Sequence, residues 1–158
     1  GSTTGNAEDA ANSINKEFEG ATITDVADFD FEGLSEYELL ILGTATFGSG
    51  ELQDEWEEKV DQLDLYDLSD KTIAIFGTGD QESYPDTFAG GMNYIYEKVE
   101  DSGAKLIGRT STAGYEFDES DSVRGDEFVG LVLDDENQAQ FTDKRIKDWV
   151  VQLVSEME

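Results

Sequence analysis

Residues 37–48 read Tyr-Glu-Leu-Leu-Ile-Leu-Gly-Thr-Ala-Thr-Phe-Gly, an apolar run that ends in a glycine- and threonine-rich loop. The nearly continuous apolar run over 37–42 is typical of a strand covered on both faces, as in a parallel sheet. A second such strand is predicted over 72–76, and the loop Gly-Thr-Gly-Asp-Gln follows it at 77–81. In open α/β sheets ligands bind where the strands end, so these two loops are candidates for one binding site.

Helical periodicity separates the predicted strands. Apolar residues recur at helical spacing in four segments, which begin near residues 6, 51, 87 and 142. Three further strands are predicted over 21–27, 104–109 and 129–133. Strands that alternate with helices predict a parallel sheet with right-handed crossovers. Residues 110–128 are polar and too long for an ordinary connection, so we interpret them as an insertion that interrupts the edge strand.

A third loop, Gly-Ser-Thr-Thr-Gly-Asn at residues 1–6, leads directly into the first predicted helix. Its side chains and backbone N–H groups are donors for an anion, and the positive end of a helix favours a phosphate. The alternative is that Thr4 or Asn6 only caps the helix. The loop lacks both the lysine of a Walker A motif and the three spaced glycines of the dinucleotide fingerprint. With Phe47 and Tyr84 in the other two loops, a ligand with a phosphate and a flat ring is predicted.

No strand precedes the first loop in this sequence. In a fold of this kind that strand lies in the middle of the sheet, and its absence leaves two neighbours unpaired beside an apolar slot. Unsatisfied buried backbone groups cost about 1–3 kcal/mol each, which a domain stable by about 5–15 kcal/mol cannot absorb. We therefore expect the protein to carry a few residues before Gly1.

The composition limits the classes of function. A length of 158 residues predicts one domain, and 38 acidic against 10 basic residues give a formal net charge of −28. This charge disfavours nucleic acid and anionic membranes as partners and favours basic protein surfaces, although general solubility or a high-salt environment explains it equally well. Because cysteine and histidine are absent, we expect no catalytic residue, no metal site and chemistry that belongs to a cofactor. Without a signal peptide or an apolar span of roughly 20 residues, a cytoplasmic location is expected.

Together these motifs resemble those of the flavodoxins, small electron carriers that bind flavin mononucleotide (FMN). The resemblance covers the whole chain and rests on the three loops, with Gly-Glu-Leu-Gln-Asp-Glu-Trp at 50–56, Ala-Gly-Tyr-Glu-Phe at 113–117, Phe-Val-Gly-Leu at 128–131 and Asp-Asp-Glu-Asn-Gln at 134–138. The interrupted last strand is similar to that of the long-chain branch. The resemblance implies a doubly wound, five-stranded parallel sheet in the order 2-1-3-4-5, flanked by helices, of which the first strand is the missing one.

The resemblance also implies that FMN is held without a covalent bond. The phosphate would be bound by Ser2 to Asn6 and the backbone of Ala7. Tyr84 would stack on the outer face of the ring, and Phe47 would cover the inner face, where many members carry tryptophan. Asp80 would contact the polar edge of the ring or bracket it through backbone groups. The complete implied set is Ser2, Thr3, Thr4, Gly5, Asn6, Ala7, Thr44, Ala45, Thr46, Phe47, Gly48, Gly77, Thr78, Gly79, Asp80 and Tyr84.

Other residues near these loops are expected to make secondary ligand contacts, to pack in the core or to form a turn. Thr44, Thr46 and Thr78 are expected to donate to ribityl or phosphate oxygens, and Trp56 is interpreted as a core residue of a helix. The acidic run 134–136 does not have the spacing of a calcium loop, so we expect a ribityl contact or a solvated turn there.

The implied function is that of a low-potential one-electron carrier, not an enzyme, which shuttles FMN between semiquinone and hydroquinone. Gly48 tolerates a peptide flip that would place its carbonyl against the protonated N5 of the flavin. The expected partners of the monomer are basic surfaces of reductases and low-potential oxidoreductases. Candidates for docking them are the acidic residues Glu51, Asp54, Glu82 and Asp86, and the alternative for each is a solvated acidic face.

Two other functions are compatible with a doubly wound domain. An FMN-dependent NAD(P)H or quinone reductase of the same fold needs a second substrate pocket, and no nicotinamide site is evident in the sequence. A cofactor-free domain like a response regulator needs an acidic pocket with a lysine in the corresponding loops. It also leaves Phe47 and Tyr84 unexplained.

Overall fold

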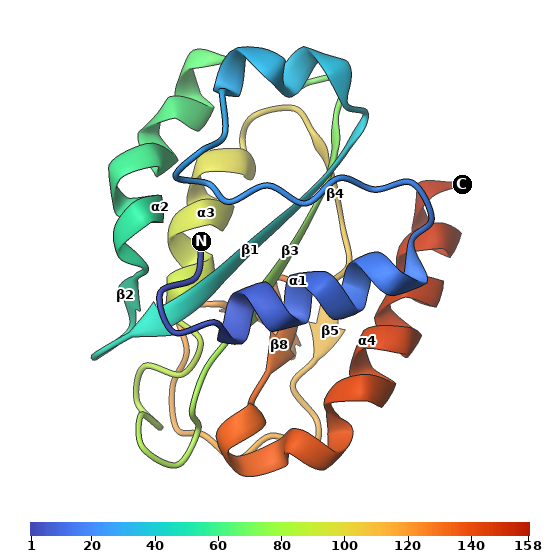
Figure 1. Cartoon of the computed structure of the whole chain (residues 1–158). Coiled ribbons are helices and arrows are strands. Elements are labelled where there is room, and N and C mark those ends of the chain that lie inside the picture. The colour runs from blue at the N-terminus through green and yellow to red at the C-terminus, as the bar shows by residue number, and fades with distance from the viewer.

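A computed structural model describes all 158 residues, and its centre is a mostly parallel sheet (Figure 1). Strand β3 (Thr72–Thr78) pairs along one edge with β1 (Leu39–Phe47), from Leu39 opposite Thr72 to Ala45 opposite Thr78. Its other edge is shared by two short strands, because β4 (Lys105–Ile107) pairs with its first half and β8 (Leu131–Leu133) with its second. The predicted interruption of the edge strand is thus confirmed.

Helices cover both faces of this sheet, which confirms the predicted α/β class. Figure 1 shows α1 (Asn6–Glu17) and α4 (Asp135–Met157) on one face, and α2 (Asp54–Lys59) and α3 (Gly91–Val99) on the other. Alternate side chains of β3 enter the two layers. Ile73 and Ile75 belong to the core cluster that contains α3, whereas Ala74 and Phe76 belong to the cluster that contains α1 and α4.

The helix boundaries differ from those expected. The helix predicted from residue 51 is preceded by the short strand β2 (Glu51–Leu52) and continues as the 3₁₀ helix η2 (Val60–Leu65). The segment predicted to be helical from residue 87 forms turns until α3 begins at Gly91. The last helix begins at Asp135 instead of Thr142, since the side chain of Asp134 caps it by accepting from the backbone N–H of Asn137.

The insertion folds as a small antiparallel sheet of its own. Its strands β5 (Thr110–Ser111), β7 (Glu127–Phe128) and β6 (Val123–Arg124) are hydrogen-bonded in that order. Three of its aromatic rings pack on Phe88, with centroid distances of 5.9 Å to Tyr115, 5.2 Å to Phe117 and 6.0 Å to Phe128. The insertion is therefore anchored to the segment that precedes α3.

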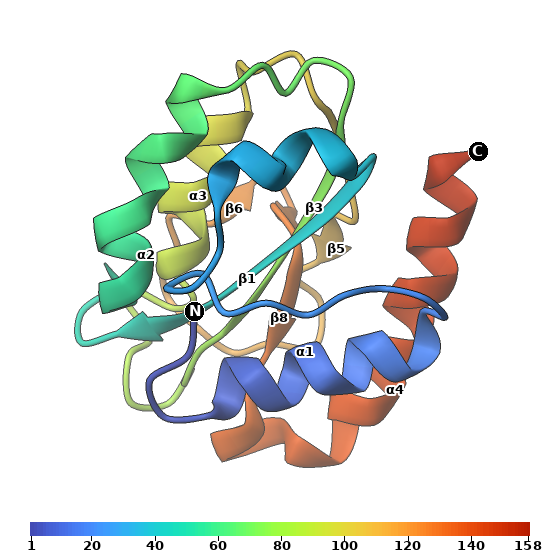
Figure 2. The same ribbon diagram turned by 45° about the horizontal axis from the view of Figure 1, so that its top comes forward.

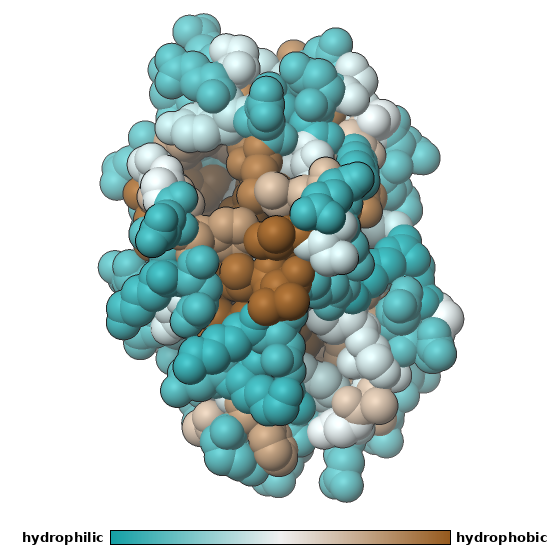
Figure 3. Space-filling view, turned by 90° about the vertical axis from the view of Figure 1, so that its right-hand side faces the viewer, coloured by the Kyte–Doolittle hydropathy of each residue, from teal (hydrophilic) through white to brown (hydrophobic).

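The strand predicted over residues 21–27 is wrong. Both Figure 1 and Figure 2 show this segment as an irregular chain between α1 and η1 (Phe31–Glu36). No strand lies between it and β1, so its backbone groups find no ladder partner. The expected apolar slot is present instead, as a groove of about 270 Å³ that is lined in part by Ile14, Phe18 and Leu40. Below we call it the β1 groove. Figure 3 views the molecule from the right-hand side of Figure 1 and shows apolar residues gathered around a hollow.

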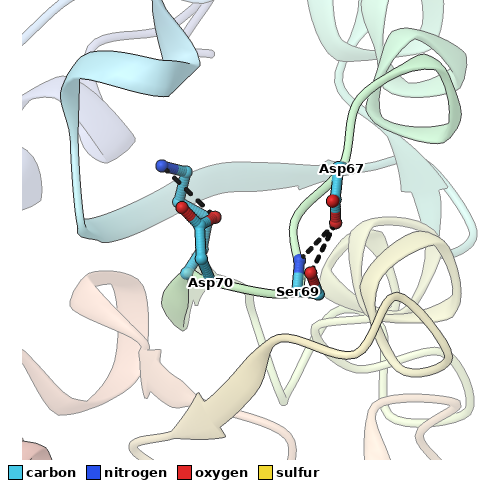
Figure 4. Close-up of polar contacts among 4 residues, drawn as sticks. Asp67, Ser69 and Asp70 are labelled. Atoms are coloured by element: carbon cyan, nitrogen blue, oxygen red, sulfur yellow. Dashed lines mark hydrogen bonds and ion pairs between the residues drawn. The ribbon is translucent and has the colours of Figure 1, made fainter.

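A hydrogen-bonded turn fixes the end of the sheet at which β3 begins. Asp67 accepts from the backbone N–H of Ser69 at 2.9 Å and from its hydroxyl at 2.6 Å, as Figure 4 shows. These bonds hold the pKa of the Asp67 carboxyl below its ordinary value. Lys71, which is only 5% exposed, closes the turn with its N–H to the carbonyl of Leu68 and leads into β3. None of the helices combines the length and apolarity that crossing a bilayer requires.

Candidate functional site

The loops after β1 and β3 meet the N-terminus of α1 around a cavity of about 190 Å³. Parallel strands end at the same edge of the sheet, so the fold itself brings these loops together. The first turn of α4 closes the cavity on the remaining side. Its lining consists of Thr4, Asn6, Ala45, Thr46, Phe47, Thr78, Gly79, Asp80, Tyr84, Thr87, Ala89, Asp135 and Glu136.

One end of the cavity is suited to an anion. Helix α1 begins after Gly5, which has a φ of 93° and provides no side chain to cap the first turn. The alternative of a helix capped by Thr4 or Asn6 is therefore wrong. Gly5 donates its own N–H to the hydroxyl of Ser2 at 3.2 Å, which curls the loop back on itself. The first N–H groups of a helix have no partner within it, and Thr4 and Asn6, at the start of α1, line the cavity.

The other end presents aromatic rings. Phe47 is half-buried at the end of β1, whereas 44% of Tyr84 is exposed. The loop after β3 passes close to the turn segment that precedes α3. A Cβ at residue 79 would lie 2.9 Å from the ring of Phe88 and 3.1 Å from the N–H nitrogen of Ala89, so this close approach requires glycine. Phe47 and Tyr84 both line the cavity, and Tyr84 is the more exposed of the two.

The floor of this end is acidic. Asp80 accepts hydrogen bonds from the N–H of Ser83 at 3.0 Å and from the side-chain amide of Asn137 at 2.8 Å. Partial burial raises the pKa of the Asp80 carboxyl, but these hydrogen bonds outweigh it and hold the pKa below its ordinary value. Asp135 and Glu136 add two exposed carboxyl groups from α4. The carboxyl groups of Asp80, Asp135 and Glu136 thus line the same cavity as the N-terminus of α1.

Some predicted site residues lie outside the cavity. The buried hydroxyl of Thr44 donates to the carbonyl of Ala45, so it is not free for a ligand. Ser2 and Ala7 line the β1 groove. Gly77 is buried where a Cβ would meet Met92 at 2.3 Å, so it serves packing. Thr3, Gly5 and Gly48 flank the cavity without lining it.

Thr46 and Trp56 both make hydrogen bonds within the protein. Thr46 lines the cavity, but its hydroxyl accepts from the N–H of Gly91 at 3.0 Å and so fastens β1 to the start of α3. Trp56 is 4% exposed, which confirms it as a core residue, and its indole N–H donates to the carbonyl of Gly43 at 2.8 Å.

Sequence reasoning missed several residues. Thr87 and Ala89 enter the lining because turns replace the first part of the predicted helix. Gln53 is fully buried, and its amide donates to the hydroxyl of Thr3 at 3.0 Å, which holds the first loop against α2. Nothing in the sequence marks Gln53 as buried, because an isolated glutamine near a helix start is more often exposed.

Comparisons with known proteins agree with this architecture. The family model described as Flavodoxin matches residues 1–149. A flavodoxin of Picosynechococcus is 45% identical over 156 residues, which are 97% of this chain and 92% of that protein. A flavodoxin of Helicobacter pylori is 42% identical over 153 residues, again 97% and 92% of the two chains.

A solved flavodoxin structure also resembles this one. The crystal structure of Fusobacterium nucleatum flavodoxin bound to flavin mononucleotide superposes with a TM-score of 0.92 at 30% sequence identity. It covers 98% of this chain and 93% of that one. A family match over nearly the whole chain, relatives above 40% identity and the shared fold lead to one conclusion: this chain belongs to the flavodoxin family.

Proposed function

We propose that the cavity holds FMN without a covalent bond and that the chain carries single electrons between redox proteins. One observation carries this proposal: the cavity has an uncapped helix N-terminus at one end and two aromatic residues, Phe47 and Tyr84, at the other. A phosphate attached through a polar chain to a flat ring matches both ends. Family membership supports the same function, and no feature of the chain favours the reductase alternative.

The lining residues divide into three groups by the part of FMN that they would contact. Thr4, Asn6 and the first N–H groups of α1 bind the phosphate, because a helix N-terminus attracts negative charge. Thr78 offers a hydroxyl to the ribityl chain. Tyr84 and Phe47 cover the two faces of the ring, with Tyr84 on the side exposed to solvent. Compared with the set expected from the sequence, Thr44 and Gly77 are left out and Thr87 is added.

FMN supplies the one-electron redox chemistry when it is bound. The chain controls the proton and the charge around the ring. Gly48 lies in the turn after Phe47 with a φ of 47°, and because glycine tolerates other backbone conformations, its carbonyl can turn to accept a hydrogen bond from the ring. Asp80, Asp135 and Glu136 oppose additional negative charge on the ring.

Burial of the ring contributes more to a low potential than the distant acidic charges do. A unit charge at ~10 Å in water is worth about 0.4 kcal/mol, and salt screens it further. Individual distant carboxylates therefore change the potential little. Exclusion of water by Phe47 and Tyr84 makes the nearby charge of Asp80 more effective, and we propose that this combination gives a low potential.

The proposed partners are reductases and low-potential oxidoreductases with basic surfaces. Glu51 in β2, Asp54 at the start of α2, and Glu82 and Asp86 in the segment after β3 are all exposed. Complementary charge raises the rate of encounter and makes it fall with ionic strength. A single FMN-binding domain that acts as a monomer fits this function. The cytoplasmic location expected from the sequence stays a prediction, which cell fractionation tests.

Stepwise anaerobic reduction with dithionite tests the function. The purified chain, mixed with FMN and freed of excess ligand, is expected to show a flavin spectrum that reduces in two resolved one-electron steps. A chain that retains no FMN contradicts the proposal. Riboflavin, which lacks the phosphate, is the matched control ligand. We expect it to bind at least about tenfold more weakly, since charged hydrogen bonds contribute about 1.5–3 kcal/mol each.

A further inference from the structure

The end of β8 holds a buried acidic group that the proposed FMN contacts do not use. The carboxyl of Asp134 is fully buried, and both of its oxygens accept hydrogen bonds. One bond, of 3.0 Å, comes from the backbone N–H of Gln81, in the loop that carries Asp80 and Tyr84. The others come from the backbone N–H of Asn137 at 3.1 Å and from its side-chain amide at 2.9 Å. Asp134 therefore joins the first turn of α4 to the ligand-binding loop.

Asn137 lies between two carboxyl groups. Its side-chain nitrogen donates to Asp134 and also to Asp80, at 2.8 Å. An amide –NH₂ has two hydrogens, so one can serve each acid. Two carboxylates brought together repel each other unless donors separate them. Asn137 is the side chain that donates to both, and this allows Asp80 to face the cavity next to a buried acid.

The backbone of α4 is shaped for this bridge. Gln138 departs from helical geometry with φ −134° and ψ 34°, so the turn of residues 135–137 is oriented separately from the rest of α4. The side chain of Gln138 donates to the carbonyl of Gly114 at 2.8 Å, which fixes the break against the insertion. Figure 1 shows this turn directly below β8.

The loop is held on a second side by the insertion. Gln81 is only 4% exposed, and its side-chain oxygen accepts from the backbone N–H of Glu116 at 2.6 Å. The Gln81 backbone and side chain thus bind two different elements. The segment that carries Asp80 and Tyr84 is fastened before any ligand is present, and such preorganisation lowers the entropy that binding must overcome.

We propose that Asn137 is a positioning residue which, by bridging Asp80 to buried Asp134, fixes the loop of residues 79–84 in the geometry that receives the ring of FMN. This inference rests on the proposed function for its ligand. It adds a residue that does not line the cavity, and it assigns the first turn of α4 the role of a fixed support for the loop.

The first test compares Asn137→Ala with Gln140→Ala in the protein without FMN. Gln140 is an exposed amide side chain on the same helix and makes no hydrogen bond, so it is the matched control. We expect hydrogen exchange of the Gln81 and Ser83 amides to be at least tenfold faster in Asn137→Ala than in the control. Equal exchange in both variants overturns the proposal.

The second test measures FMN affinity in a double-mutant cycle with Asp80→Asn. Asn137→Ala is expected to raise the Kd for FMN about tenfold, which corresponds to about 1.4 kcal/mol. In the Asp80→Asn background, where no second carboxylate is present, the same substitution is expected to change the Kd less than threefold. A general structural role for Asn137 predicts the same loss in both backgrounds, and that result overturns the proposal.

The two tests separate the inference from the function on which it rests. If the wild-type chain binds no FMN, the proposed function is wrong, while the exchange comparison still decides whether Asn137 holds the loop. If the wild type binds FMN and the cycle shows no coupling, only the inference is wrong. Thermal unfolding of each variant verifies that it is folded at the temperature of the measurement.

Discussion

Tyr115 shows how a single side chain can join three parts of the fold. It comes from the insertion, its hydroxyl donates to the carbonyl of Val132 in β8, and its ring lies 4.0 Å below the guanidinium carbon of Arg145 in α4. Burial raises the pKa of Tyr115 to about 12, and the opposing influence of the Arg145 charge is smaller. The contact should therefore persist through the physiological range and fail in alkali.

Above pH 10 the ionisation of Tyr115 is expected to lower the free energy of unfolding. The folded-state pKa of about 12 exceeds the ordinary value of 10.0, so the unfolded chain loses its proton first as the pH rises. Stability should then fall between these two values, by about 2–3 kcal/mol in total. Urea unfolding at about pH 8 and about pH 11.5 measures this loss. Tyr115→Phe should be less stable at the lower pH and lose less on going to the higher one. An identical pH dependence in both proteins would contradict the prediction.

Tyr84 is expected to contribute to FMN binding rather than to stability. It is 44% exposed and borders the cavity, so Tyr84→Ala should weaken FMN binding by about 1–2 kcal/mol, or roughly fivefold to thirtyfold, through lost stacking. Tyr84→Phe should bind within a few-fold of the wild type. Quenching of FMN fluorescence on titration with the apoprotein gives the Kd.

Tyr94 provides the control for this experiment. It is 46% exposed on α3 and does not line the cavity, so Tyr94→Ala removes a similar side chain without touching the site. If Tyr94→Ala weakens binding as much as Tyr84→Ala, the effect does not come from stacking on the ring.

At the scale of elements, the sequence predicts strands best where both faces are buried. The runs over 37–42 and 72–76 became β1 and β3 because their side chains fill both layers. The prediction over 21–27 failed because a strand needs a neighbour to pair with, and pairing is not a property of the segment itself. The start of α4 was misplaced by seven residues because its cap, Asp134, is buried by contacts with the distant loop at Gln81.

The same distinction, between what a segment determines by itself and what its neighbours determine, explains which site residues the sequence predicts. Loop chemistry predicts the residues that follow strands, such as Thr78, Gly79 and Asp80, because strand ends converge in this fold. It does not predict that the Thr44 hydroxyl donates internally, or that the Thr46 hydroxyl accepts from Gly91 and keeps its own proton to donate. Asp135 and Glu136 line the cavity only because the break at Gln138 orients the first turn of α4 toward it.

The pairing of β3 with the β8 edge depends on a close backbone approach at Gly130. A Cβ there would lie 1.9 Å from the carbonyl oxygen of Ile75, and this backbone atom cannot move aside easily. Gly130→Ala should therefore lower the free energy of unfolding by about 3 kcal/mol or more. Gly33→Ala, where a Cβ meets nothing within 4 Å, should change it by no more than about 0.5 kcal/mol. Urea denaturation of both variants measures the difference. Equal midpoints would show that the close approach at Gly130 does not determine the stability of the fold.

At the scale of the whole molecule, the net charge of −28 is expected to oppose folding by self-repulsion. Salt screens this repulsion, so the melting temperature should rise as NaCl increases from about 0.01 M to about 1 M. Over the same range the rate of association with a basic redox partner should fall. A melting temperature that does not respond to salt would mean that counter-ions already neutralise the acidic surface at low ionic strength.

The β1 groove gives this charge a second consequence, which concerns colloidal behaviour. The outer edge of β1 lies beside an apolar groove, and an uncovered strand edge is a template on which another chain can add a strand. Repulsion between highly charged copies keeps such edges apart at low ionic strength. Salt that stabilises each folded molecule also removes that protection, so solutions of this chain should be clearest at intermediate salt and turn turbid at high salt.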